Sequence, residues 1–156
     1  MAATIDLFTE REGTLIGLDL GVKTIGVAVC DPRQTLATPV TTIKRSKFTA
    51  DAETLVRMAS ERRAIGYVLG LPRNMDGSDG PKVQATKTFA KNLARRTELP
   101  IVLWDERLST AAAERHLIGL DVSRAKRAAV IDSHAASFIL EGALARLAEL
   151  RRGSGG

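Results

Sequence analysis

The chain has 156 residues, of which 44% are hydrophobic and 26% are charged, so it has the size and apolar content of one ordinary domain. A single cysteine excludes an internal disulfide, and one cysteine with two histidines all but excludes a zinc site of the Cys/His type. Any metal would be held by oxygen, as Mg²⁺ or Mn²⁺ is. The formal charge of +5 suits a nucleic-acid partner without requiring one.

The ends of the chain carry no targeting pattern. The N-terminal stretch MAATIDLFTEREG lacks the basic and apolar regions of a signal peptide. No apolar run approaches the roughly 20 residues that span a bilayer. We therefore expect a cytoplasmic protein with no membrane partner. Residues 1–12 and 151–156 are polar or glycine-rich, and they are expected to be flexible tails of a single domain over residues 13–150.

The first part of the chain predicts an antiparallel meander of three strands. Residues 15–20 and 24–30 are rich in aliphatic and β-branched side chains, and Gly21 lies in the short turn between them. A third strand is expected over residues 36–43. Short connections of this kind join strands that run in opposite directions.

Helical periods then alternate with short apolar runs. The expected elements are a helix over residues 50–63, a strand over 65–71, a helix from Pro81 to about 97, a strand over 101–104, a helix over 111–118 and a helix over 131–150, whose start could lie at 128. Helical connections favour parallel strands with right-handed crossovers. The sequence thus predicts an α/β fold with a mixed five-stranded sheet, three antiparallel strands followed by two parallel ones, flanked by helices.

Three acids lie near the expected ends of elements. Asp19 interrupts the apolar strand LIGLDL, Glu106 follows a strand in WDER, and Asp132 lies in VIDSHAAS near the expected start of the last helix. Each has a plain structural explanation, respectively a turn acceptor, a solvated acid paired with Arg107, and a helix N-cap. As a set, they predict a site for two divalent cations about 3.5–4 Å apart that cleaves phosphodiesters. Metal would also explain why a carboxylate is tolerated in an apolar strand.

Four stretches resemble the YqgF (RuvX) family, which is related to Holliday junction resolvases and has an RNase H-like fold. They are GLDLGVKTIGVAV at 17–29, GLPRNMDGSDGP at 70–81, LWDERLST at 103–110 and KRAAVIDSHAASFILEG at 126–142. The resemblance implies a bacterial nuclease, linked to maturation of the 5′ end of 16S ribosomal RNA. It carries the acidic, metal-binding site onto Asp19, Glu106 and Asp132. The first stretch alone is weak, since sugar kinases and actin-like ATPases share its DLG hairpin.

Basic and glycine-containing segments are candidates for binding nucleic acid, although a solvated surface explains most of them as well. The candidates are Lys23 in the first turn, Arg73, Asn74 and Gly77 in the loop before Pro81, the row Lys87, Lys91 and Arg95, and Arg107 and Lys126 near the acids. Whether Asp105 or His134 takes part in catalysis stays open.

The function favoured by these features is a metal-dependent endonuclease that processes the 5′ end of pre-16S ribosomal RNA. Its alternatives are a Holliday junction resolvase and a non-catalytic nucleic-acid-binding assembly factor. An actin-like nucleotide-binding module is disfavoured, because such modules clamp nucleotide between two domains and this chain has room for one. The expected partner is precursor ribosomal RNA or branched DNA, and the expected state is a monomer or a weak homodimer.

Overall fold

The computed structural model describes residues 4–72, 76, 78–105 and 124–154, and for residues 124–133 it describes the backbone alone. Five strands form one sheet in the order β3-β2-β1-β4-β5. The elements are a short 3₁₀ helix η1 (Ile5–Phe8), β1 (Thr14–Leu20), β2 (Thr24–Cys30), β3 (Ala37–Lys44), α1 (Phe48–Glu61), β4 (Ala64–Leu71), α2 (Pro81–Ala94), β5 (Ile101–Asp105) and α4 (Arg124–Ser154).

The predicted fold class is confirmed. β1 pairs antiparallel with β2, and β2 pairs antiparallel with β3. β4 runs parallel to both β1 and β5. The sheet is therefore mixed as expected, with β1 at its centre between the meander and the parallel pair. The helix expected over residues 111–118 lies outside the described residues.

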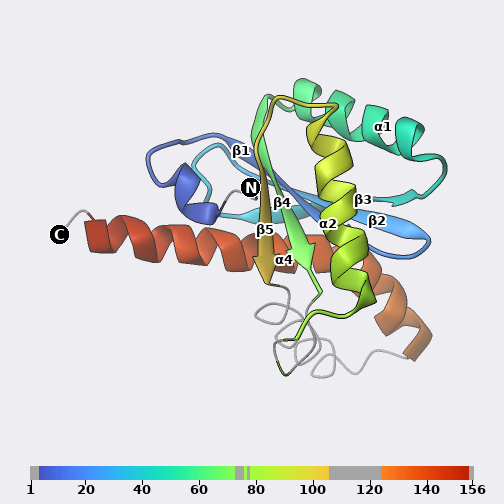
Figure 1. Ribbon diagram of the computed structural model, residues 1–156. Coiled ribbons are helices and arrows are strands. Elements are labelled where there is room, and N and C mark those ends of the chain that lie inside the picture. Colours follow the sequence, from blue (N-terminus) through green and yellow to red (C-terminus); the bar gives the residue numbers. More distant parts are fainter. Residues whose placement is uncertain (1–3, 73–75, 77, 106–123, 155–156) are drawn as a thin grey trace.

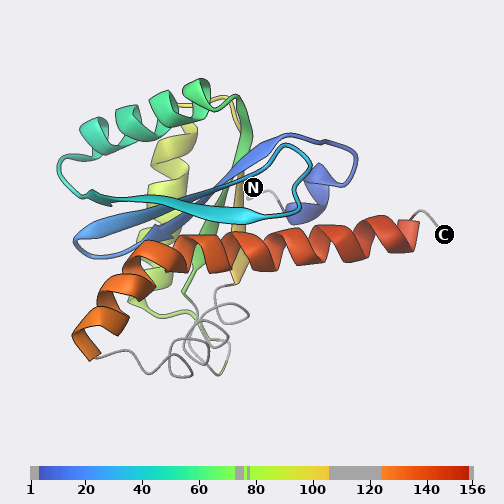
Figure 2. The ribbon, with the colours of Figure 1, turned by 180° about the vertical axis from the view of Figure 1, so that it is seen from behind.

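Helices cover the two faces of the sheet and divide the core into two layers (Figure 1, Figure 2). α1 and α2 pack on one face, where Ile16 and Leu18 of β1 point. α4 packs on the other face, against Leu15 of β1 and Val68 of β4. The side chains of β1 thus alternate between the two layers. No helix among the described residues is long and apolar enough to cross a membrane.

Both expected tails contribute to the packing. In η1, Ile5 and Phe8 are buried in the layer under α4. α4 continues to Ser154, and the Arg151 guanidinium donates hydrogen bonds to the carbonyl oxygens of Phe8 and Thr9. These contacts place the C-terminal end of α4 beside η1, close to where β1 begins.

α4 also starts seven residues before the expected position, at Arg124. Asp132 therefore lies within the helix, which removes the interpretation of this residue as an N-cap. The segment RAKRAAVI is rich in good helix formers, so it extends the apolar period that begins further along the chain. α2 ends earlier than expected, at Ala94, and Thr97 accepts a hydrogen bond from the Leu99 amide in the turn that follows.

Candidate active site

Asp19 lies at the carboxyl-terminal edge of the sheet, by which we mean the side of the sheet at which β1, β4 and β5 end. It is the second-last residue of β1 and pairs with Gly26 of β2. Its neighbour Leu18 pairs with Leu69 of β4, which pairs with Leu103 of β5. Because β1, β4 and β5 are parallel, their carboxyl ends meet at this edge.

The side of the sheet on which Asp19 lies is set by alternation along β1. Leu15 points into the layer under α4, so residues 17 and 19 share that face. At Gly17 the helix comes close, since a Cβ there would lie 2.8 Å from the Ala136 carbonyl oxygen and 2.9 Å from Leu140 Cβ. A glycine in β1 thus allows direct contact between strand and helix, two residues before Asp19.

The direction of α4 brings its N-terminal half toward the same edge. Its C-terminal end is fixed beside η1 by Arg151, near the start of β1, and the helix then passes over Gly17 at Ala136. Toward its N-terminus it approaches the end of β1. Residue 132 is one turn before Ala136 and on the same side of the helix. The backbone at Asp132 therefore lies toward the edge that carries Asp19, while its side chain lies outside the described residues.

β5 supplies the third strand end. Trp104 packs in the layer under α4 and Leu103 packs in the other layer. Alternation places Asp105 on the face opposite Asp19, which disfavours it as a partner of Asp19. Between β1 and β5, the residue of β4 that pairs with Trp104 is Gly70, which has no side chain. Glu106 comes directly after the strand and lies outside the described residues.

His134 is placed poorly for catalysis. It lies two residues before Ala136, about 200° around the helix, and Ala136 faces β1. Its carbonyl oxygen accepts a hydrogen bond from Ser137 Oγ at 2.7 Å. Among the described side chains there is no group of three or more His, Cys, Asp or Glu residues able to hold a metal. Two of the three predicted ligands lie outside that set.

A small basic recess lies beside the end of β1. Its volume is about 120 Å³, and it is lined by Gly21, Arg45 and Lys82 among others. Arg45 Nη1 donates a hydrogen bond to the Gly21 carbonyl oxygen at 2.6 Å, and the Arg45 amide donates to the Lys23 carbonyl oxygen. The exposed Lys23 is in the same turn. Sequence reasoning missed Arg45 and Lys82, because folding alone brings them together beside the end of β1. Leu20 and α2 line the recess, so it lies on the face of the sheet opposite Asp19.

The other predicted nucleic-acid contacts fall into two groups. Lys87 and Lys91 of α2 line a groove between α2 and β5, while Arg95, also exposed, follows the end of α2. Lys87 Nζ lies 3.6 Å from Asp79 Oδ2 in a largely solvated ion pair. The second group lies outside the described residues: Arg73, Asn74, Gly77 and Arg107. Lys126 belongs with them, because the structure describes its backbone in α4 but not its side chain.

Comparisons with known proteins concern the chain as a whole. The family model described as RuvX, Holliday junction resolvase, matches residues 13–146. A protein of Bradyrhizobium sp. (strain BTAi1) is 68% identical over 91% of this chain and 88% of its own length, and one of Rhodopseudomonas palustris (strain TIE-1) is 69% identical over 90% and 88%. Both carry the name "Putative pre-16S rRNA nuclease".

Among solved structures, RuvC of T. thermophilus in complex with a Holliday junction substrate superimposes with a TM-score of 0.55. The alignment covers 87% of this chain and 96% of RuvC, at 13% sequence identity. At this level of identity, the likeness shows a shared fold. It agrees with the RNase H-like architecture expected from the sequence.

Proposed function

Because the chain belongs to the RuvX family of Holliday junction resolvases, we propose that it is a nuclease that cuts structured nucleic acid at the edge of the sheet marked by Asp19. The observation that carries this proposal is the meeting of β1 and α4. Asp19 lies on the face that α4 covers, and the helix passes toward the same edge with residue 132 one turn beyond its contact at Gly17. A carboxylate at this position has the chemistry of a metal ligand.

The proposed catalytic set is Asp19, Glu106 and Asp132, with Mg²⁺ or Mn²⁺ as the cofactor. All three donors are carboxylate oxygens, which these hard cations prefer. When bound, such ions activate the attacking water and stabilise the leaving oxygen of a phosphodiester. In this proposal β1 holds Asp19, and α4, whose Ala136 and Leu140 come close to Gly17, carries Asp132 on its backbone toward the same end of the sheet.

The residues around the acids would hold the nucleic-acid backbone. Arg45 and Lys82 give the recess beside β1 two positive charges, which can bind a phosphate of the substrate beyond the end of β1, on the face of the sheet opposite Asp19. Lys23 lies in the adjoining turn. The same role stays proposed for the remaining candidates of the sequence: Arg73, Asn74, Gly77, Arg107 and Lys126.

The proposed substrate is the 5′ end of pre-16S ribosomal RNA, processed in the bacterial cytoplasm. The names of the relatives support this choice, since they are about two-thirds identical over most of the chain. Resolution of a four-way DNA junction is the second candidate, and it is favoured by the description of the family. The two candidate functions require the same chemistry at the acids. They differ in which substrate is cut, so an assay of both substrates distinguishes them.

A side-by-side cleavage assay tests the proposal. One preparation is incubated with labelled precursor 16S ribosomal RNA and, separately, with a labelled synthetic four-way junction, each with Mg²⁺, with Mn²⁺ and with EDTA. We expect metal-dependent cutting of the precursor near its mature 5′ end. Cutting of the junction alone would reassign the substrate. Binding of both substrates without any cutting would instead support a non-catalytic assembly factor.

A further inference from the structure

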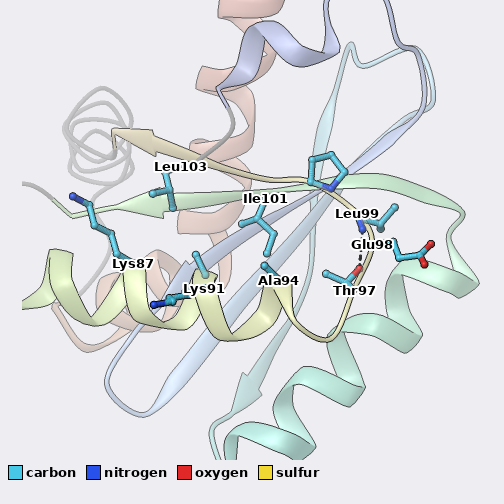
Figure 3. Close-up of a pocket in the computed structure, with 10 residues that line it drawn as sticks. Lys87, Lys91, Ala94, Thr97, Glu98, Leu99, Ile101 and Leu103 are labelled. Atoms are coloured by element: carbon cyan, nitrogen blue, oxygen red, sulfur yellow. Dashed lines mark hydrogen bonds between the residues drawn. The ribbon is translucent and has the colours of Figure 1, made fainter. Parts of the chain in front are cut away.

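A groove of about 800 Å³ runs along the boundary between α2 and β5 (Figure 3). Its volume lies in the range of sites that enclose organic ligands, which is far more than one ion needs. β5 is the last strand of the sheet, so the groove opens at the side of the molecule. It is separate from the small basic recess at the end of β1, because the two share no lining residue.

The two walls of the groove differ in chemistry. Lys87 and Lys91 lie one turn apart on α2 and form a positively charged rim, which helix geometry spaces by about 6 Å. The floor is aliphatic and comes from Leu99, Ile101 and Leu103. A ligand that fits both walls must combine regularly spaced negative charges with flat apolar surface.

The groove runs toward the carboxyl-terminal end of β5. Its floor lies on the face of the sheet opposite Asp19, so a bound strand reaches the acids by passing over the ends of the strands. Leu103 lies two residues before the end of β5, where the chain continues into Glu106, and Lys87 is the lining lysine nearer the start of α2 (Figure 3). At its other end the groove reaches Glu98, whose negative charge is unfavourable for a phosphate. The two lysines therefore lie in the part of the groove nearer the ends of the strands, where Asp79 partly offsets the charge of Lys87 through its ion pair.

We propose that this groove binds the unpaired strand next to the cleaved bond, with successive phosphates on the rim of Lys87 and Lys91 and bases over the floor of Leu99, Ile101 and Leu103. The inference rests on the proposed nuclease function and names the form of its substrate, a junction between paired and unpaired nucleic acid. A duplex presents phosphates to the rim, but its stacked bases cannot reach the floor. Aliphatic contact with bases does not read sequence, so selection here is for an unpaired strand.

Binding can be measured apart from cleavage by working in EDTA. The probe is a short labelled single-stranded RNA, compared with a duplex of the same sequence in fluorescence anisotropy over a series of salt concentrations. The test variant is Lys87→Ala with Lys91→Ala. The matched control is Arg57→Ala with Arg62→Ala, which removes the same charge from exposed positions at α1 that do not line the groove.

We expect the parent to prefer the single strand and the groove variant to lose that preference. Loss of two phosphate contacts should reduce the slope of log affinity against log salt by about 1.4 for a single strand. The control variant should keep both slope and preference. Equal affinities of the groove and control variants for the single strand would overturn the proposal, as would a parent that binds duplex as tightly as single strand.

Photocrosslinking then locates the strand. RNA that carries 4-thiouridine is irradiated on the parent and on the groove variant, and the modified peptides are identified by mass spectrometry. Crosslinks at Leu99, Ile101 or Leu103, lost in the variant, support the groove, whereas crosslinks confined to other surfaces contradict it. Because neither readout needs cleavage, a groove that binds in a protein that cuts nothing would refute the nuclease function and leave the groove intact.

Discussion

Substitution of Gly17 by alanine tests the contact on which the geometry of the active site depends. The added Cβ would lie 2.8 Å from the Ala136 carbonyl oxygen, whereas Cβ atoms essentially never approach closer than 3.0 Å. It would also lie 2.9 Å from Leu140 Cβ. The first of these atoms belongs to the backbone of α4 and the second is attached directly to it, so neither can move aside as the end of a flexible side chain could. The helix must therefore shift away from β1 by a few tenths of an ångström.

The expected cost has two parts. Overpacking of a filled core costs about 1–3 kcal/mol, and replacement of glycine by alanine returns about 0.4–1 kcal/mol through the unfolded state. We expect the free energy of unfolding to fall by about 1–2 kcal/mol, which lowers the melting temperature by roughly 2–8 °C for a chain of this size. On the proposed function, the same shift moves the backbone at residue 132 relative to Asp19. Turnover should also fall, by less than the roughly hundredfold that a misplacement of about 1 Å can cost.

Urea unfolding and cleavage of labelled precursor RNA measure the two effects on the same protein. The matched control is Gly153→Ala, also a glycine of the described part of the chain, where an added Cβ meets nothing within 4 Å. It should cleave like the parent and melt at the same temperature or slightly higher, since alanine is the better helix former. A Gly17→Ala protein with unchanged stability and unchanged turnover would refute the close packing of α4 on β1.

Three further predictions concern the frame around the site. The Asp31 carboxylate accepts hydrogen bonds from the Leu36 amide and from the hydroxyl and amide of Thr35, which lower its pKa to about 2. Its stabilising contribution should therefore be present above about pH 4 and disappear as the pH falls toward 2. Melts of the parent and Asp31→Asn should accordingly differ at pH 7 and converge at pH 2. Arg151→Ala should lower the free energy of unfolding by about 1–3 kcal/mol in urea titrations, while the exposed Arg146→Ala should change it little. Burial raises the pKa of the Cys30 thiol, so alkylation at neutral pH should be slow in the folded protein and fast in urea; rapid alkylation without urea would contradict the burial.

The strands could be predicted from the sequence because their signals are local. The hairpin of β1 and β2 follows from two β-branched runs and a glycine turn, and the parallel pairs follow from the helices that connect them. The tail contacts could not be predicted in this way. Ile5 and Phe8 become core residues only because α4 extends far enough for Arg151 to hold the backbone of η1.

The site shows the same division between local and tertiary information. Asp19 could be identified because a carboxylate in an apolar strand is costly. Its side of the sheet, and the exclusion of Asp105 from that side, follow from a register that the structure supplies. The closeness of α4 depends on Gly17, which in the sequence reads as one more small residue of a strand.

The central claim is that Asp19, Glu106 and Asp132 act as one metal-binding unit, and Mn²⁺ binding measures this most directly. Isothermal titration of the parent, Asp19→Asn, Glu106→Gln and Asp132→Asn is combined with cleavage assays and melts on the same samples. We expect each substitution to weaken Mn²⁺ binding and abolish cleavage without lowering stability, and the double variants to be no worse than the single ones. Parent-like Mn²⁺ binding and cleavage by Asp19→Asn, or full cleavage by the parent in EDTA, would contradict the account.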